Sequence, residues 1–413
     1  MAPNRNQKIA GDFAVTKPRF ATYAYVVAMT LVLLAIANHL VAGLNVDPLT
    51  VAQNQRVMFI GARYPGDPVF AGLPQNQPER LSLLYVGNSQ SYAVMDYSPG
   101  DRSMIAWLSY LLNGGDENAS SRFAVRYGSD PNLRMSELLV KSAVAATDRA
   151  HRPDVVVAGI VLDSFRWLDA RPEVAVTAAS GPAREVLLQA TRTQPELPLA
   201  NQVVAAVTGL AANPGAGARP AVDPSGLHKR LLNADEALQA QLDARFALFA
   251  HRKDVYSWLA AHYMAGRNAL ARVDTATRRP VPPELYRANL ELMELTVRLL
   301  RAHGVQPILY FAPIRPVEPN PYDPADVARF RRDFLEVCRR SGALCFDYSN
   351  LIPEDMWTNY PEDVPSSGGQ RDYAHFTNRA HRRLAEQLQS DAGAALHGWL
   401  AAKASHAQAV PGS

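Results

Sequence analysis

Short continuous apolar runs that alternate with helical segments are the feature that most limits how this chain can fold. Three of these runs have the length and hydrophobicity of strands buried on both faces: LSLLYV at 81–86, DVVVAGIV at 154–161 and QPILYF at 306–311. Weaker strand patterns lie at 121–127 and 343–347, and helical spacing occurs at 135–150, 283–303, 325–340 and 378–400. Strands that alternate with helices predict an α/β fold with a three-layer parallel sheet.

The carboxyl ends of parallel strands locate the expected site. Ligands bind beyond these ends in open α/β sheets, so the loops of interest are those that follow Val86, Val161, Phe311 and Asp347.

The alternation is interrupted between about 172 and 283, where the chain is Ala-rich and helical apart from a Pro- and Gly-rich loop at 213–224. A clear helical pattern lies at 256–270. We interpret the stretch as a helical insertion in one α/β domain at 79–400; a separate small helical domain is the alternative. Residues 401–413 are expected to form a flexible tail.

The N-terminal region contains a run from Phe20 to Leu44 without Asp, Glu, Lys or Arg. About twenty such residues span a bilayer as a helix. Basic residues at 5, 8, 17 and 19 precede the run, so the positive-inside rule predicts that 1–19 is a cytoplasmic tail. A cleaved signal peptide is the alternative, because 35–37 reads Ala-Ile-Ala. The Pro- and Gly-rich residues 45–78 are expected to be a linker, which places the main domain outside the cytoplasm of a single-pass protein.

Composition excludes several classes of function. The net charge of +3 over 413 residues gives no reason to expect nucleic acid. No metal-ligand spacing or phosphate-cradling Gly-rich loop is present, so no cofactor is expected. Cys338 and Cys345, the two cysteines, are too few for a disulfide scaffold, but outside the cytoplasm they could form one disulfide.

A serine stands where a nucleophile would be presented. The strand at 81–86 runs into Gly87-Asn88-Ser89, and glycine permits a tight strand-to-helix turn. The N-terminus of the following helix would offer backbone N–H groups to an oxyanion. The simpler alternative is that Ser89 is an N-cap or turn residue.

A second block supports the catalytic interpretation. RDYAHF at 371–376 places Asp372 and His375 three residues apart before the last helix. We expect them in a short loop, where Asp372 can orient the imidazole. The alternative is that His375 packs on that helix; His381, further along, is expected to be a surface residue.

Ser89 after the first strand, with D-x-x-H before the last helix, resembles the SGNH (GDSL-type) hydrolase superfamily. The resemblance implies a flavodoxin-like sheet, Ser89 as nucleophile, His375 as general base and then acid, and Asp372 as its orienting group. The chain departs from the family in having Asn88 where Asp is usual and Ala380 where Gly is common.

The oxyanion blocks of the family are also altered. The loop after the second strand offers Gly128 or Asn132 beside the Ser89 N–H. The G-x-N-D block after the third strand is replaced by Leu-Asp-Ser-Phe-Arg at 162–166, which makes Asp163 and Arg166 candidate substrate contacts. Asn88, Arg315 and Trp357 are further candidates; solvent exposure of Arg315 and packing of Trp357 are their alternatives.

The anchor, early serine, helical insertion and late D-x-x-H look like a branch of cell-envelope acyl-transfer proteins that includes the D-alanyl-lipoteichoic acid biosynthesis protein. That resemblance implies an acyl-serine intermediate, a glycan or lipid-linked substrate and a multi-spanning membrane-bound O-acyltransferase as partner. A periplasmic carboxylesterase or deacetylase is one alternative. A non-catalytic assembly partner is the other, favoured by the missing G-x-N-D block.

Overall fold

The computed structural model describes residues 20–43, 57–59, 77, 79–95, 98, 100–115, 122–129, 132–147, 151–179, 181–209, 242, 245–246, 263, 266–360 and 369–409. The chain divides into two compact units, Met1–Thr50 with Val222–Ala260, and Val51–Ala221 with Ala261–Ser413. In the first unit the structure describes mainly helix α1 (Phe20–Gly43). Among the described residues, which for the side chains of α1 are 29–40, no helix is both long and apolar enough to cross a membrane. The predictions for 1–19, for 213–224 and for most of 45–78 and 256–270 fall outside the described residues.

The second unit is built on a parallel sheet of five strands in the order β4-β2-β5-β6-β7. Its strands are β2 (Leu81–Val86), β4 (Phe123–Tyr127), β5 (Val155–Ile160), β6 (Gln306–Phe311) and β7 (Leu344–Asp347). Counted along the chain, this is the order 2-1-3-4-5 of flavodoxin-like doubly wound sheets. The sequence prediction of a parallel α/β sheet is confirmed.

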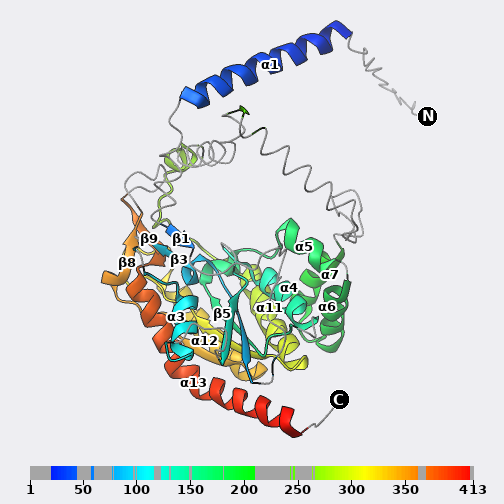
Figure 1. Cartoon of the computed structure of the whole chain (residues 1–413), viewed down its shortest axis with the longest axis vertical. Coiled ribbons are helices and arrows are strands. Elements are labelled where there is room, and N and C mark those ends of the chain that lie inside the picture. Colours follow the sequence, from blue (N-terminus) through cyan, green and yellow to red (C-terminus); the bar gives the residue numbers. More distant parts are fainter. Residues whose placement is uncertain are drawn as a thin grey trace, which may run out of the picture. The chain divides into compact units, whose positions relative to one another are not determined.

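Helices cover both faces of this sheet, because alternate strand residues point to opposite sides. Leu84, Val156 and Leu309 pack in one core with α4 (Met135–Thr147), α11 (Pro283–Ala302) and α12 (Pro324–Ser341). Leu83, Val157 and Ile308 pack in a second core with α3 (Met104–Leu112) and α13 (Asn378–Ala409). Figure 1 shows α3 and α13 on one side of β5 and α4 and α11 on the other.

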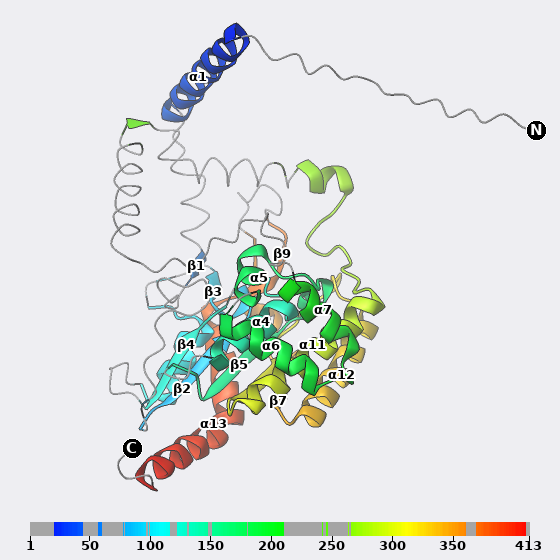
Figure 2. The same cartoon turned by 90° about the vertical axis from the view of Figure 1, so that its right-hand side faces the viewer.

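Among the described residues, three helices follow the point where the predicted insertion begins: α5 (Pro172–Ala178), α6 (Gly181–Thr193) and α7 (Pro198–Gly209). Their buried residues Val174, Leu187 and Val204 belong to the same core as α4 and α11. Figure 2 shows α6 and α7 in front of α4. These helices therefore extend the outer layer of the α/β unit.

Several short elements were not expected from the sequence. β1 (Val57–Phe59) pairs antiparallel with β3 (Ala93–Met95), and β8 (Trp357–Asn359) pairs antiparallel with β9 (Arg371–Phe376). The described part of the chain also contains the 3-10 turns η1 (Ser89–Ser91), η2 (Leu162–Arg166) and η4 (Glu354–Met356). The last helix, α13, continues to Ala409, so the flexible tail expected from residue 401 is helical over most of its length.

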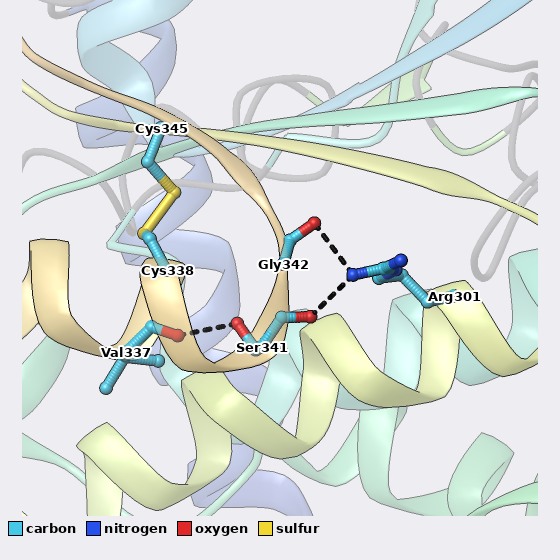
Figure 3. The surroundings of a disulfide bond; sticks show 6 residues. All are labelled: Arg301, Val337, Cys338, Ser341, Gly342 and Cys345. Atoms are coloured by element: carbon cyan, nitrogen blue, oxygen red, sulfur yellow. Dashed lines mark hydrogen bonds between the residues drawn. A yellow bond between two sulfur atoms is a disulfide. The ribbon is translucent and has the colours of Figure 1, made fainter.

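A disulfide joins α12 to the edge strand β7. Figure 3 shows the bond between Cys338 and Cys345. Their Cα atoms are 6.1 Å apart. Gly342 ends α12 in the left-handed region at φ 75°, and Nη1 of Arg301 donates to the carbonyl oxygens of Ser341 and Gly342, both at 3.0 Å. The tight reversal from α12 into β7 brings the two cysteines together.

Candidate active site

The structure brings together the three residues that the sequence singled out for nucleophilic chemistry. Ser89 begins η1 directly beyond β2, and Asp372 and His375 lie on β9. The distance from His375 Nε2 to Ser89 Oγ is 2.8 Å, and that from His375 Nδ1 to Asp372 Oδ2 is 2.7 Å. Residues separated by 286 positions thus form one continuous hydrogen-bonded chain with the geometry of a Ser-His-Asp triad.

The Asp372 carboxylate is fixed by its own backbone. It is completely buried, and its Oδ1 accepts the N–H groups of Ala374 at 2.8 Å and His375 at 3.1 Å. Its Oδ2 therefore remains for the imidazole. Because an ionised carboxylate can only accept hydrogen bonds, this contact places the proton of neutral His375 on Nδ1 and leaves the Nε2 lone pair facing the Ser89 hydroxyl.

This pair lies in a strand, which differs from the short loop that the sequence suggested. β8 pairs with β9 through an irregular register, and this hairpin carries Asp372 and His375. Arg315 supports the hairpin, since its Nη1 donates to the carbonyl oxygens of Thr358 at 2.6 Å and Asp372 at 3.0 Å. Glu354 accepts from Nε of the same guanidinium at 3.0 Å.

The turn at Ser89 also differs from the expected strand-to-helix junction. After β2 the chain makes the single 3-10 turn η1 and then enters β3, and no long helix begins at the serine. Asn88 caps this turn, because its Oδ1 accepts the Gln90 N–H at 3.0 Å. Gln90 Nε2 donates to the Pro313 carbonyl at 3.0 Å, which ties the turn to the loop beyond β6. Among the described residues the Ser89 N–H has no acceptor, so it remains available to an oxyanion.

Gly87, which precedes this turn, is required because a side chain at this position would not fit. A Cβ on Gly87 would lie 2.9 Å from Cε1 of Tyr85, and one on Gly159 would lie 2.6 Å from the Tyr310 hydroxyl. The hydroxyls of Tyr85 and Tyr310 are hydrogen-bonded to each other beneath the turn, and burial raises the pKa of Tyr85 to about 12. Two glycines therefore make room for a buried tyrosine pair beside the turn at Ser89.

A cavity of about 440 Å³ opens at the carboxyl edge of the sheet beside Ser89. It lies at the strands where the topology reverses, as expected for an open α/β sheet. The loops after β2, β5 and β6 line it, as predicted, but the loop after Asp347 contributes no lining residue among those described. The residues that line it include Asn88, Ser89, Asn132, Asp163, Arg166 and Trp167.

Gly128 and Asn132, the two candidate oxyanion donors in the loop after β4, differ in position. The Gly128 N–H donates to the Tyr85 carbonyl at 2.7 Å, which continues the pairing of β4 with β2. Asn132 has a positive φ of 51° and lines the cavity, whereas Gly128 does not. The geometry therefore favours Asn132 as the second donor.

The candidate substrate contacts fall into two groups. Asn88, Asp163 and Arg166 line the cavity. Arg315 and Trp357 do not line it: Arg315 is 4% exposed within the hairpin contacts described above. Trp357 is buried against Phe376, and its Nε1 donates to the Ile352 carbonyl at 3.1 Å. Trp357 is thus a packing residue, and Arg315 supports the hairpin from behind.

Asp163 organises the far wall of the cavity. Its Oδ2 accepts from Arg279 Nη1 at 2.7 Å and from the Tyr322 hydroxyl at 2.8 Å. Burial alone would lower the pKa of Arg279, but Asp163 raises it above the ordinary value. Burial and the same carboxylate raise the pKa of Tyr322 well above its usual range. This network joins the loop after β5 to the segment before α11 and to the loop after β6.

Several residues of the cavity were not predicted from the sequence, because they lie far along the chain from the Ser89 and Asp372–His375 motifs. Arg134, Arg171, Arg279 and Tyr322 come from four segments with no shared motif. Trp167 is the missed residue that the sequence could most easily have indicated, since it follows directly after the unusual 162–166 block.

The prediction for His381 was wrong. It was expected at the surface but is completely buried, and its Nδ1 accepts the Met104 N–H at 3.1 Å.

Among the described residues, no group of three or more His, Cys, Asp or Glu side chains could hold a metal ion. Comparisons of the chain with protein-family models, with curated proteins and with solved structures found no match. The functional assignment therefore rests on the site itself.

Proposed function

We propose that this protein is a serine-dependent esterase or O-acyltransferase of the SGNH hydrolase type. The observation that carries the proposal is the chain of hydrogen bonds from Ser89 Oγ through His375 to the buried Asp372. The 2-1-3-4-5 strand order, the early serine and the late D-x-x-H agree with the resemblance drawn from the sequence. Acyl transfer through serine is the chemistry that this constellation serves.

The reaction follows from the hydrogen-bond directions. His375 Nε2 takes the proton from Ser89 Oγ as the oxygen attacks the ester carbonyl carbon. The resulting oxyanion accepts the Ser89 N–H and a second donor, for which Asn132 is the best placed. Collapse of the intermediate breaks the ester bond, and His375 returns its proton to the departing alcohol. An acceptor hydroxyl then attacks the acyl-serine with His375 again as base, which restores Ser89.

We further propose that the catalytic unit lies outside the cytoplasm and is anchored to the cytoplasmic membrane by residues 20–44. The uncharged run and the basic residues before it support this orientation. The disulfide between Cys338 and Cys345 supports the same compartment, because disulfides persist under oxidising conditions.

The acceptor is proposed to be a cell-envelope glycan or a lipid-linked molecule, with a multi-spanning O-acyltransferase supplying the acyl group across the membrane. This part rests on the resemblance alone. A simple carboxylesterase would use the same triad with water as the acceptor.

Transfer and hydrolysis can be separated with the full chain in detergent micelles. The protein is incubated with an acyl-ester reporter, with and without an oligosaccharide, and products are identified by mass spectrometry. We expect acylated oligosaccharide from the wild type and none from Ser89→Ala. Free acid as the one product under every condition would exclude transferase activity and support an esterase. If the wild type formed no product, both the esterase and the transferase proposals would be rejected.

A further inference from the structure

One wall of the cavity is cationic and plays no part in the triad. It is formed by Arg134, Arg166, Trp167 and Arg171, all of which line the cavity, and is called the arginine wall below. η2 and the residues just after it supply three of these side chains, and the loop before α4 supplies Arg134. The wall stands in place of the missing G-x-N-D block.

Two of its arginines are already held in place by carboxylates. Nε and Nη2 of Arg171 both donate to the fully buried Glu137 at 2.7 Å. Arg134 forms an ion pair with the exposed Asp169. The bidentate contact with buried Glu137 orders the Arg171 side chain in the wall.

Arg166 is held less tightly by carboxylates than Arg134 and Arg171 are. Among the described residues its one ion pair is with Asp163, at 3.6 Å between Nη1 and Oδ1, and its side chain is 35% exposed. The other oxygen of Asp163 already accepts from Arg279 and Tyr322. A guanidinium has five donors arranged in a fork that matches a carboxylate, so Arg166 retains the capacity to bind an anion.

Trp167 follows Arg166 in the chain, lines the same cavity and is 46% exposed. The Arg134 guanidinium carbon is 5.1 Å from the centre of its ring. A large, exposed aromatic ring in a cavity wall suits an apolar surface that also carries polar edges, such as the C–H face of a sugar ring.

We propose that the arginine wall is the acceptor subsite and that it binds an acidic sugar, with the carboxylate of a uronic acid on Arg166 and the sugar face on Trp167. This inference rests on the proposed function, because it names the acceptor class for acyl-Ser89. Both residues line the same cavity as Ser89, so a sugar bound to them would share one cavity with the acyl-serine.

Binding can be tested without turnover by titrating the full chain in detergent micelles. The ligands are a galacturonate tetramer, a neutral galactose tetramer and glycerol 3-phosphate. We expect the acidic tetramer to bind at least about tenfold more tightly than the neutral one, as for one charge-assisted contact. Arg166→Gln should abolish this preference, and Trp167→Ala should weaken both tetramers. Arg339→Gln, at an exposed ion pair on α12, is the matched control and should change neither affinity.

Equal affinity for the two tetramers, no binding of either, or an unchanged preference in Arg166→Gln would overturn the proposal. Glycerol 3-phosphate binding as tightly as the acidic tetramer would show that the wall recognises an anion and not a sugar, and would also overturn it. Since the titration requires no acyl transfer, an inactive Ser89 would leave its result intact.

Discussion

Arg315 illustrates how a residue behind the site can control its geometry. Its guanidinium is buried and contacts Glu354 together with the carbonyl oxygens of Thr358 and Asp372. The Asp372 side chain in turn holds His375. We therefore propose that Arg315 is a positioning residue, which acts on His375 through the backbone of Asp372.

Arg315→Lys tests this role because lysine keeps the charge but loses the planar fork. We expect the free energy of unfolding to fall by about 2 kcal/mol, from the loss of charge-assisted hydrogen bonds in a buried place. On a reporter ester, kcat should fall about tenfold with little change in KM, since the binding cavity is untouched.

The exposed pair between Arg339 and Glu336 offers the same chemical change as a control. Arg339→Lys should alter stability by less than about 0.5 kcal/mol and leave kcat unchanged. If Arg315→Lys matched this control in kcat, the positioning role would be rejected.

At the scale of elements, His381 joins three parts of the fold. It lies on α13, accepts from Met104 at the start of α3, and its Nε2 lies 3.0 Å from the Ala93 carbonyl in β3. Burial lowers the pKa of His381 to about 3. The imidazole therefore stays neutral in the folded protein at pH values where the unfolded chain takes up a proton.

Stability should accordingly decrease as the pH falls from about 6.5 towards 3, because in this window the unfolded state binds more protons than the native state. Between pH 7.5 and 5.5 the wild type should lose about 1.4 kcal/mol more than His381→Gln, whose amide does not titrate. Urea unfolding at the two pH values measures this difference. Equal losses in the two proteins would show that His381 does not couple folding to pH.

The sequence predicted the long elements well and the short ones poorly. The strands at 81–86 and 306–311 are identical to the predicted ranges, because continuous apolar runs identify buried parallel strands. β8 and β9 were missed, since RDYAHF lacks an alternating apolar pattern and its pairing depends on distant support from Arg315.

The same distinction applies to the site. Ser89, Asp372 and His375 could be found because each lies in a local pattern beside a strand or helix end. Arg279 and Tyr322 could not, because only the folded chain brings them to Asp163. The burial of His381 could likewise not be predicted, since helical periodicity alone does not show which side of α13 faces α3.

At the scale of the whole molecule, the proposed anchor determines where the chemistry takes place. In cells we expect the full chain to remain with the membrane after alkaline carbonate washing, and deletion of residues 1–44 to release it. An alkaline phosphatase fusion after residue 50 should be active, because the positive-inside rule places that position outside. Release of the full chain by carbonate, or an inactive fusion with normal expression, would contradict the anchor or its orientation.

The central claim is that Ser89 is a nucleophile activated by His375 and Asp372. A fluorophosphonate probe tests it most directly, because the probe reacts covalently with activated serines and requires no knowledge of the acyl group or acceptor. We predict labelling of the wild type at Ser89, confirmed by peptide mass spectrometry, and none of Ser89→Ala. His375→Ala should be labelled far more slowly. Absence of labelling in the wild type, or equal labelling of wild type and Ser89→Ala, would contradict the account.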